Sequence, residues 1–487
     1  MSVSKRVFKN STILLFTNII GKIALALVGI VIARKLGSSE LGKLAYASSV
    51  IAILDSISTF GLNIFTIRKI PKIGSSKVNH YQAQIFTLRF LVNLVFTILF
   101  LVYTELFIAD ATIKVLFNVL NISSLINVYS SHWIILYRLR EDMKYEGILR
   151  LFDSVLYGIT GVILVINGLG VVYLVYTMFA VSIIKAIFCH VFLRKETSYT
   201  IRFAFDRHDW INIVRGTFPF ALMTIIGIIY YRIDTIFIEA LLGLSFVGFY
   251  SAAYKIMETL KIFPEIISTA VFPTLTHNIS KNTALVQKST MQLLKWLNIL
   301  AFPLAVGGTL LADKGIILLY GEQFTSSIVV MQILFWTLIP LFNSAITSAI
   351  INASKKPVVN LYLGISNLVV NVGVNLLLIP VVGIKGAAIA TVCNESVGFI
   401  LGYIYIKRAV FSLSIWKELL KIILASVMMG IVIIFTGKNL YLIPLYILVY
   451  WGLVLGVRLV NKDDAIVLKK IIPNFIKSRL VFLKEAL

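Results

Sequence analysis

Long runs of apolar residues, separated by short polar gaps, repeat along the whole chain. A helix needs about 20 apolar residues to cross a bilayer, and fourteen stretches approach or reach that length. They lie near 12–33, 44–66, 84–103, 113–136, 150–166, 170–191, 214–233, 246–268, 296–312, 328–351, 360–379, 386–406, 418–436 and 440–458. The runs do not alternate with a period of two, which excludes a membrane β-barrel. The pattern predicts an all-α integral membrane protein.

The composition agrees with lipid as the main solvent of this chain. The 487 residues are 59% hydrophobic with a mean hydropathy of +0.93, which is more apolar surface than a water-soluble globule hides. We do not expect a cleavable signal, because the first run carries Lys22 and leads into Arg34 and Lys35 without a cleavage site. Cys189 and Cys393 fall in predicted helices and indicate no disulfide framework.

The positive charges fall in every second gap. Of the 45 Lys and Arg residues, 32 lie at the two ends or in alternate gaps, seven in the other gaps and six inside predicted helices. Basic loops stay cytoplasmic, so both termini are predicted to be cytoplasmic. The net charge of +23 is therefore a signature of topology and does not indicate a nucleic-acid partner. The tail 465–487 is either an amphipathic segment on anionic membrane lipids or a solubilising tail.

A weak repeat appears at an offset of 206 residues. Residues 36–48 (LGSSELGKLAYAS) align with 242–254 (LGLSFVGFYSAAY), and Leu, both Gly, one Ser and one Ala coincide. Each copy follows the first helix of a half and opens the second, so the halves are parallel repeats, an arrangement that transporters use with a site between the halves. We predict an N-terminal lobe at 1–205, a C-terminal lobe at 206–410, two appended helices within 411–460 and a cytoplasmic tail at 461–487.

Ionisable residues inside predicted helices are the first candidates for function, because each costs about 2.5–3.5 kcal/mol at the bilayer centre. Lys22, Asp55, Lys255 and Glu258 all fall near the predicted midplane. On the predicted helix 246–268, the polar residues share one arc of the helical wheel; they are Ser251, Tyr254, Lys255, Glu258, Lys261 and Glu265. This arc either lines a cavity or holds intrahelical pairs at i,i+3 and i,i+4.

Other polar residues in the helices leave two interpretations open. Arg232 and Asp234 lie near the outer boundary, as an outer gate contact or as ion pairs to other helices. Asn371 and Asn375 share a face with Asn360 and Asn367, and their amides suit either sugar hydroxyls or interhelical bonds. The five histidines form no metal-ligand cluster.

Several stretches together resemble one family. They are 34–42 (RKLGSSELG), 231–234 (YRID), 242–255 (LGLSFVGFYSAAYK), 319–324 (LYGEQF) and 383–391 (GIKGAAIAT) followed by Glu395. In order and spacing the chain resembles the polysaccharide-transporter branch of the multidrug/oligosaccharidyl-lipid/polysaccharide (MOP) exporter superfamily, and is most similar to Wzx-type flippases of O-antigen or capsule repeat units. The resemblance implies two six-helix lobes around a central cavity, as in multidrug transporters of that superfamily, with two further C-terminal helices.

The resemblance also implies a function. Such proteins move undecaprenyl-diphosphate-linked oligosaccharides from the cytoplasmic to the periplasmic leaflet of the bacterial inner membrane, and a polymerase and chain-length proteins are expected partners. A diphosphate in a low-dielectric cavity needs cationic partners. Lys22 and Lys255 are the first candidates to bind it, followed by Lys261 and Arg89. Asp55 and Glu258 either hold the lysines or carry a coupling H⁺ or Na⁺.

Three alternatives remain at this stage. A multidrug/cation antiporter of the same superfamily usually has twelve helices and acidic cavities, whereas lysines at the midplane favour an anionic cargo. A lipid II flippase has fourteen helices, but its first-helix arginine pattern is poorly matched here. A membrane glycan polymerase or ligase needs a large outward loop, and no gap is long enough for one. The chain has no nucleotide-binding Gly-rich motif, so we expect a transporter without enzymatic activity or cofactor.

Overall fold

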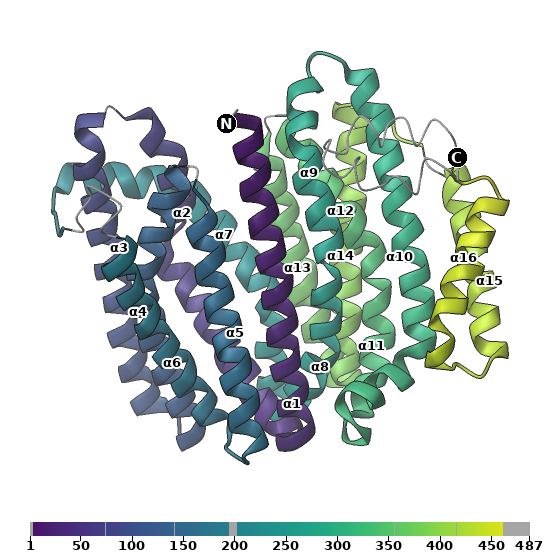
Figure 1. Ribbon diagram of the computed structural model, residues 1–487, viewed down its shortest axis with the longest axis horizontal. Helices are drawn as coiled ribbons and strands as arrows, with labels where there is room; N and C mark the ends of the chain where they lie inside the picture. Colours follow the sequence, from purple (N-terminus) through teal and green to yellow (C-terminus); the bar gives the residue numbers. More distant parts are fainter. Residues whose placement is uncertain are drawn as a thin grey trace. The chain divides into compact units, whose positions relative to one another are not determined.

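The computed structural model describes residues 3–73, 75–140, 142–193, 202–354, 356–414 and 416–460, all as helices and their connections. The predicted tail 461–487 lies outside them. The chain divides into two compact units, Met1–Ala252 (unit 1) and Ala253–Leu487 (unit 2). Figure 1 shows the helices coloured along the sequence.

Unit 1 contains the first seven helices. They are α1 (Val3–Thr59), α2 (Leu62–Lys69), α3 (Ser75–Phe107), α4 (Ala111–Leu139), α5 (Lys144–Ile166), α6 (Val171–Phe188) and α7 (Arg207–Leu242). Helix α8 (Leu244–Leu260) contains the boundary between the units. Because α7 packs against α1, α2 and α3, unit 1 extends past residue 205. The lobes 1–205 and 206–410 follow the sequence repeat, a different criterion, and stay a prediction.

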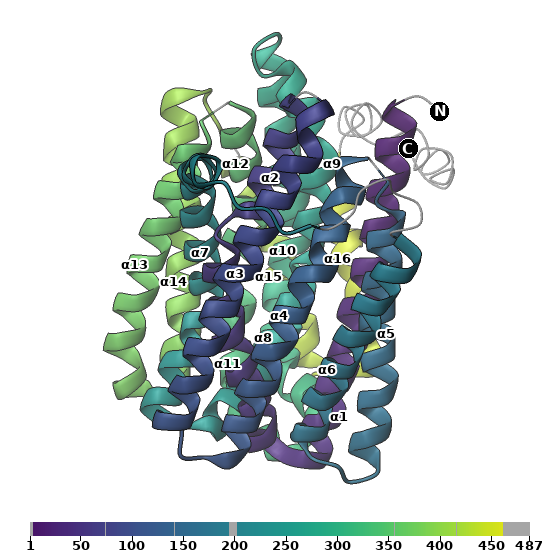
Figure 2. The ribbon, with the colours of Figure 1, turned by 90° about the vertical axis from the view of Figure 1, so that its left-hand side faces the viewer.

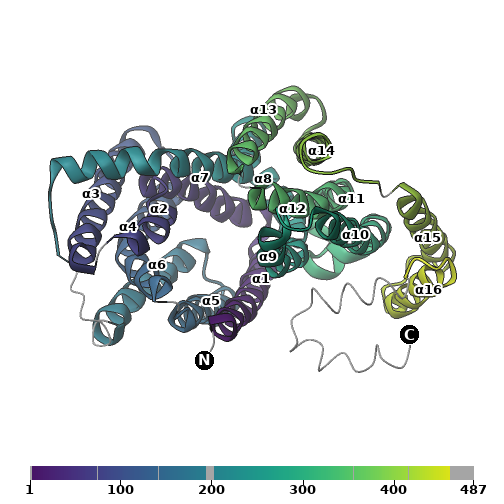
Figure 3. The ribbon, with the colours of Figure 1, turned by 90° about the horizontal axis from the view of Figure 1, so that it is seen from above.

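Unit 2 contains the remaining helices. They are α9 (Ile262–Asn278), α10 (Thr283–Tyr320), α11 (Ser326–Trp336), α12 (Leu338–Ala353), α13 (Pro357–Val382), α14 (Ile384–Ala409), α15 (Trp416–Phe435) and α16 (Ile443–Gly456). Helices α13 and α14 run side by side (Figure 3). The appended pair α15–α16 packs on α10 through an apolar cluster that includes Ile299, Met429 and Tyr450.

The helices confirm the predicted all-α membrane fold. Each of the fourteen predicted segments falls mainly on helical residues. In the described part of the chain, eleven helical stretches are long and apolar enough to cross a membrane, and Leu440–Gly456 is a shorter apolar helix. The count of fourteen is approximate, because Phe16–Lys69 holds two predicted segments in one stretch and 246–268 falls on two helices of 17 residues each.

Small residues bring α1 and α5 close together in unit 1, where the two helices lie side by side (Figures 1 and 3). A methyl group added to Gly147 would meet Ile13, and one added to Gly158 would meet Ala24 of α1. In the opposite direction, Gly21 of α1 faces the Ser154 hydroxyl of α5. Stripes of small residues allow such close helix approach in membranes. On the other side of unit 1, α4 packs against α3 and α6 (Figure 2).

The two copies of the sequence repeat share one backbone geometry. Gly37 has φ 85° and ψ −177°, and Gly243, 206 residues later, has φ 94° and ψ 173°. This region of backbone space is essentially restricted to glycine. The glycines interrupt the helix at equivalent points, between the first and second predicted segments of each half. The local geometry agrees with the predicted repeat but is not restricted to it, because Gly321 also has φ 87° and ψ 172°.

Beyond each turn, the two copies cross each other reciprocally. A Cβ atom on Gly42 would lie 1.8 Å from the backbone oxygen of Leu244, and one on Gly248 would lie 1.9 Å from the backbone oxygen of Ser38. Ser38 and Gly42 are the repeat equivalents of Leu244 and Gly248. The same contact thus occurs twice with exchanged roles, as a local two-fold relation requires. Only glycine permits backbone-to-backbone contact at both positions.

We therefore predict that Gly42→Ala and Gly248→Ala each lower the thermal unfolding midpoint of the purified protein, measured by tryptophan fluorescence in detergent. A β-carbon at either position must push two backbones apart. Gly29→Ala is the matched control, because no atom lies within 4 Å of its added methyl group, and alanine favours the helix by about 1 kcal/mol.

The double variant tests the reciprocity. Once the first methyl group has separated the backbones, the second costs less. The double variant should therefore lose less stability than the sum of the losses in the two single variants. Full additivity, or an unchanged midpoint in either single variant, would contradict the crossing.

Candidate functional site

Lys22 lies on α1 in unit 1, and its side chain is half-buried. Its neighbour Gly21 faces Ser154 of α5, so this part of α1 runs along the close α1–α5 seam. Asn18, one turn earlier on the same face of α1, accepts a 2.9 Å hydrogen bond from Nη1 of Arg150 on α5. The structure therefore places a predicted site residue one helical turn from an arginine contact that sequence analysis did not identify.

Arg150 belongs to an ion-pair network around a buried carboxylate. Glu146 is 1% exposed and accepts hydrogen bonds from Nε and Nη2 of Arg138, at the end of α4. It also accepts from Nε and Nη2 of Arg150, at 3.1 and 2.9 Å. Two guanidinium groups therefore share one carboxylate. The i,i+4 spacing of Glu146 and Arg150 could have predicted their pairing from the sequence. No local spacing could have predicted the contact of Glu146 with Arg138 across the α4–α5 turn.

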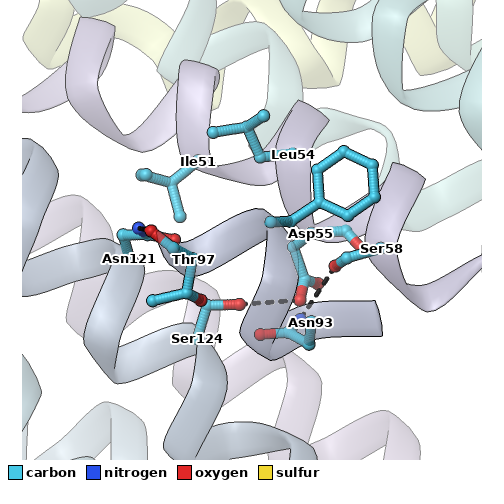
Figure 4. Close-up of a pocket in the computed structure, with 9 residues that line it drawn as sticks. Ile51, Leu54, Asp55, Ser58, Asn93, Thr97, Asn121 and Ser124 are labelled. Carbon is cyan, nitrogen blue, oxygen red and sulfur yellow. Dashed lines mark hydrogen bonds between the residues drawn. The ribbon is translucent and has the colours of Figure 1, made fainter. Parts of the chain in front are cut away.

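Asp55 lies at an open polar pocket of unit 1 (Figure 4). The pocket is small, and its lining comprises Ile51, Leu54, Asp55, Ser58, Asn93, Phe96, Thr97, Asn121 and Ser124. The Asp55 carboxylate is exposed and accepts a 2.8 Å hydrogen bond from Ser124 on α4. Asn93 on α3 donates to the Ser58 hydroxyl at 2.8 Å. Hydroxyl and amide groups from three helices thus surround one carboxylate near the predicted midplane.

Arg89, a predicted substrate-binding residue, is buried among protein side chains. The side chain is 5% exposed, and Nη1 donates to Asn63 Oδ1 at 2.9 Å. It lies one turn before Asn93 on the same face of α3, so it sits beside the Asp55 pocket without lining it. This position suits a residue that sets the electrostatic field of the pocket.

The predicted helix 246–268 is interrupted at Lys261, between α8 and α9. Pro264 explains the interruption, because it has no N–H to bond residue 260 and its ring clashes with that carbonyl. The single predicted helix is therefore two helices, which is a correction to the sequence analysis. Lys261 keeps helical dihedral angles at the junction, so the shared polar arc stays a prediction. The intrahelical interpretation is confirmed for one pair, since Lys255 Nζ lies 3.4 Å from Glu258 Oε2.

Lys261 itself is buried, at 7% exposed. Its ammonium group lies 3.3 Å from the Tyr254 hydroxyl and 5.3 Å from the centre of that ring, a cation–π geometry. Glu265 is exposed on α9. Lys261 is thus held by Tyr254, whereas Lys255 and Glu258 pair with each other and are more exposed than Lys261.

The two candidate site asparagines of α13 are enclosed in unit 2. Asn371 and Asn375 are 1% and 0% exposed, and the Asn375 amide donates to Oδ1 and to the backbone oxygen of Asn371, both at 2.9 Å. Asn367, one turn earlier, packs against Gly398 of α14. In this structure the asparagine face is part of the α13–α14 packing.

The remaining predicted residues are Arg232 and Asp234, both on α7. Asp234 is 4% exposed and accepts a 2.8 Å hydrogen bond from the Tyr250 hydroxyl. Arg232 is half-buried on another face of α7. Lys185 forms a 2.7 Å ion pair with Asp153. The described residues contain no group of three or more His, Cys, Asp or Glu side chains that could hold a metal ion.

The fold and its membrane-depth charges define a multi-pass membrane transporter. The family profile described as "Polysaccharide biosynthesis protein" matches residues 7–279, more than half of the chain. A second profile, "Lipid II flippase MurJ", matches residues 152–453. The chain therefore belongs to the polysaccharide biosynthesis protein family of the MOP superfamily, as its motifs predicted.

Two curated relatives come from Haloferax volcanii. The "Probable flippase AglR" is 27% identical over 274 residues, which cover 53% of this chain and 54% of the relative. The "Probable low-salt glycan biosynthesis flippase Agl15" is 24% identical over 305 residues, covering 60% and 62%. The chain thus matches between half and two thirds of the length of these relatives. The names are those of transport proteins, in agreement with the prediction that the chain is not an enzyme.

Solved structures share the fold. A lipid II flippase MurJ in an inward closed conformation superposes with a TM-score of 0.77 at 16% identity, covering 92% of this chain and 97% of that chain. An inward-facing MATE multidrug transporter of the MOP superfamily gives 0.68 at 17% identity, covering 80% and 94%. The chain therefore has the fold of these transporters. The predicted division into two six-helix lobes and a C-terminal pair stays a prediction.

We predict that Glu146→Gln lowers the free energy of unfolding by about 3 kcal/mol, because it removes the negative charge that two guanidinium groups share at a buried position. Denaturation of the purified protein would measure this.

Glu105→Gln is the control. The Glu105 side chain is 64% exposed and pairs with Lys114 at 3.0 Å, and exposed pairs contribute about 0–1 kcal/mol. Equal effects of the two substitutions would show that Glu146 has no special structural role.

Proposed function

We propose that this protein is a flippase that moves undecaprenyl-diphosphate-linked polysaccharide repeat units from the cytoplasmic to the outer leaflet of a bacterial inner membrane. The proposal rests on two lysines in a chain of the polysaccharide biosynthesis family. Lys22 lies in a helical stretch that is apolar enough to cross a membrane, and the sequence predicts Lys255 near the midplane. A membrane protein keeps such costly charges where a charged cargo needs them. The relatives named as glycan flippases support a lipid-linked glycan as that cargo.

Each compact unit supplies one lysine to the proposed mechanism. Lys22 on α1 belongs to unit 1 and Lys255 on α8 to unit 2. In our proposal the head group enters from the cytoplasm, the lysines bind its diphosphate, and the polyprenyl chain stays in lipid. A lysine suits a ligand that must be released again, since it is a mobile point charge. The protein then opens to the other side by alternating access.

The acids have two proposed roles. Glu258 holds Lys255 at 3.4 Å, and we propose that an arriving diphosphate takes its place. Asp55, exposed at the open pocket of unit 1, is the proposed carrier of a coupling H⁺ or Na⁺. Lys261 and Arg89 are buried and act in support. Arg232 and Asp234 stay a proposed outer gate, and the buried Asn371 and Asn375 lie outside the proposed diphosphate site.

The proposed orientation of the protein follows the positive-inside pattern. Both termini are cytoplasmic, and the basic cytoplasmic gaps attract anionic lipids. A polysaccharide polymerase and chain-length proteins would act on the product at the outer leaflet.

Lipid II flipping is the second candidate, because the lipid II flippase profile matches residues 152–453. Deleting the gene distinguishes the two. The first function predicts that a polyprenyl-diphosphate-linked repeat unit accumulates in the inner leaflet. Accumulation of the peptidoglycan precursor instead would establish the second.

We predict that Lys22→Ala and Lys255→Ala each reduce surface polysaccharide about tenfold or more in a deletion strain at wild-type protein level. The magnitude follows from losing a charged contact of about 1.5–3 kcal/mol. Arginine at either position should retain more export than alanine.

Lys314→Ala is the control, because Lys314 is exposed near the end of α10 at a predicted outward gap. Full export by both alanine variants would remove these lysines from the mechanism.

A further inference from the structure

We propose that Arg150, together with Lys22 and Asn18, forms a binding site for the diphosphate of the lipid carrier on the cytoplasmic half of unit 1. This inference rests on the proposed function and adds to it a residue and a place. The site lies on the α1–α5 seam. Arg150 is six residues from the start of α5 at Lys144, which is about 9 Å along the helix. Lys22 lies one helical turn after Asn18 on α1, and Asn18 bonds Arg150.

Among the described residues, the charges around Glu146 leave one cation in excess. Arg138 donates to both oxygens of the Glu146 carboxylate, which already satisfies the geometry of a bidentate pair. Arg150 adds a second positive charge to the same carboxylate. In the other described pairs of unit 1, each acid has one basic partner; they are Lys43–Glu40, His80–Asp209, Lys114–Glu105 and Lys185–Asp153. Asp153, three residues from Arg150, is paired with Lys185 and also interacts electrostatically with Arg150. The three cations Arg138, Arg150 and Lys185 still exceed the two acids Glu146 and Asp153 by one charge.

The Arg150 guanidinium is held in place but only partly used. A guanidinium has five N–H donors. Three of them have protein partners, because Nε and Nη2 bond Glu146 and Nη1 bonds Asn18. The side chain is nevertheless 46% exposed. Within the described residues, one donor on each terminal nitrogen thus remains for a ligand, and phosphate oxygens are suitable acceptors for guanidinium N–H groups.

Asn18 connects this guanidinium to Lys22. Residues 18 and 22 are i,i+4 neighbours on α1, which places their Cβ atoms about 6 Å apart on one face. The close approach of α1 and α5 at Gly21, Gly147 and Gly158 fixes the distance between the two helices. Two cations on adjacent helices match an anion of about two charges, and Asn18 is neutral, so it holds Arg150 without cancelling its charge.

A binding measurement tests the site. The full-length protein in phosphatidylcholine nanodiscs is titrated with radiolabelled undecaprenyl diphosphate. We expect Arg150→Gln to weaken binding at least tenfold and Arg150→Lys to weaken it less. Asn18→Asp keeps the side-chain shape and neutralises Arg150, so it should also weaken binding while the thermal unfolding midpoint stays at or above the wild-type value.

Two further arms identify the anion and the control. Inorganic pyrophosphate should compete with the lipid in the wild type and far less in Arg150→Gln. Nanodiscs containing phosphatidylglycerol test the other phosphate source. Lys144→Gln is the matched variant, because Lys144 is exposed in the first turn of the same helix and stacks on Tyr145; it should bind as the wild type does.

The outcomes separate this inference from the function. If the wild type binds undecaprenyl diphosphate and both Arg150→Gln and Asn18→Asp bind it equally well, the site is wrong and the function stands. The site is also wrong if Arg150→Gln weakens the binding of phosphatidylglycerol but not that of undecaprenyl diphosphate. If the wild type itself does not bind undecaprenyl diphosphate, the proposed function fails together with the inference.

Discussion

A buried charge needs a partner, and the protein's organisation follows from that constraint. Glu146 has two guanidinium partners, Asp234 has the Tyr250 hydroxyl, and Lys261 has the Tyr254 ring and hydroxyl. Each arrangement replaces the water that lipid cannot supply. The positions that suggest a function are those where a charge is not matched by an ion-pair partner of its own among the described residues. The exposed carboxylate at the polar pocket and the extra guanidinium on the α1–α5 seam are both in unit 1.

Glycine makes these arrangements possible, because it brings helices close enough for side chains to share partners. The α1–α5 seam places Asn18 against Arg150, and the reciprocal crossing of Gly42 and Gly248 joins the two repeat copies at backbone distance. The repeat therefore has a mechanical meaning beyond ancestry. It supplies two equivalent turns, at Gly37 and Gly243, with the same backbone geometry.

The sequence predicted the helices well because lipid imposes one length and one composition on every crossing. It also predicted the Lys255–Glu258 pair, which depends only on spacing along one helix. The break at Lys261 was missed, although Pro264 signals it, because the apolar run continues through it. Contacts across helices were out of reach, as with Arg138 and Glu146 or Arg89 and Asn63, because they depend on packing that no local spacing encodes.

The most direct test of the account is translocation by the purified protein. Proteoliposomes would contain the protein and a labelled undecaprenyl-diphosphate-linked saccharide, and a membrane-impermeant glycosidase added outside would report which saccharides are exposed. The account predicts that saccharide initially protected in the inner leaflet becomes cleavable only when the protein is present, while a labelled phosphatidylcholine stays protected. Saccharide that remains protected, or a phospholipid that crosses equally fast, would contradict it.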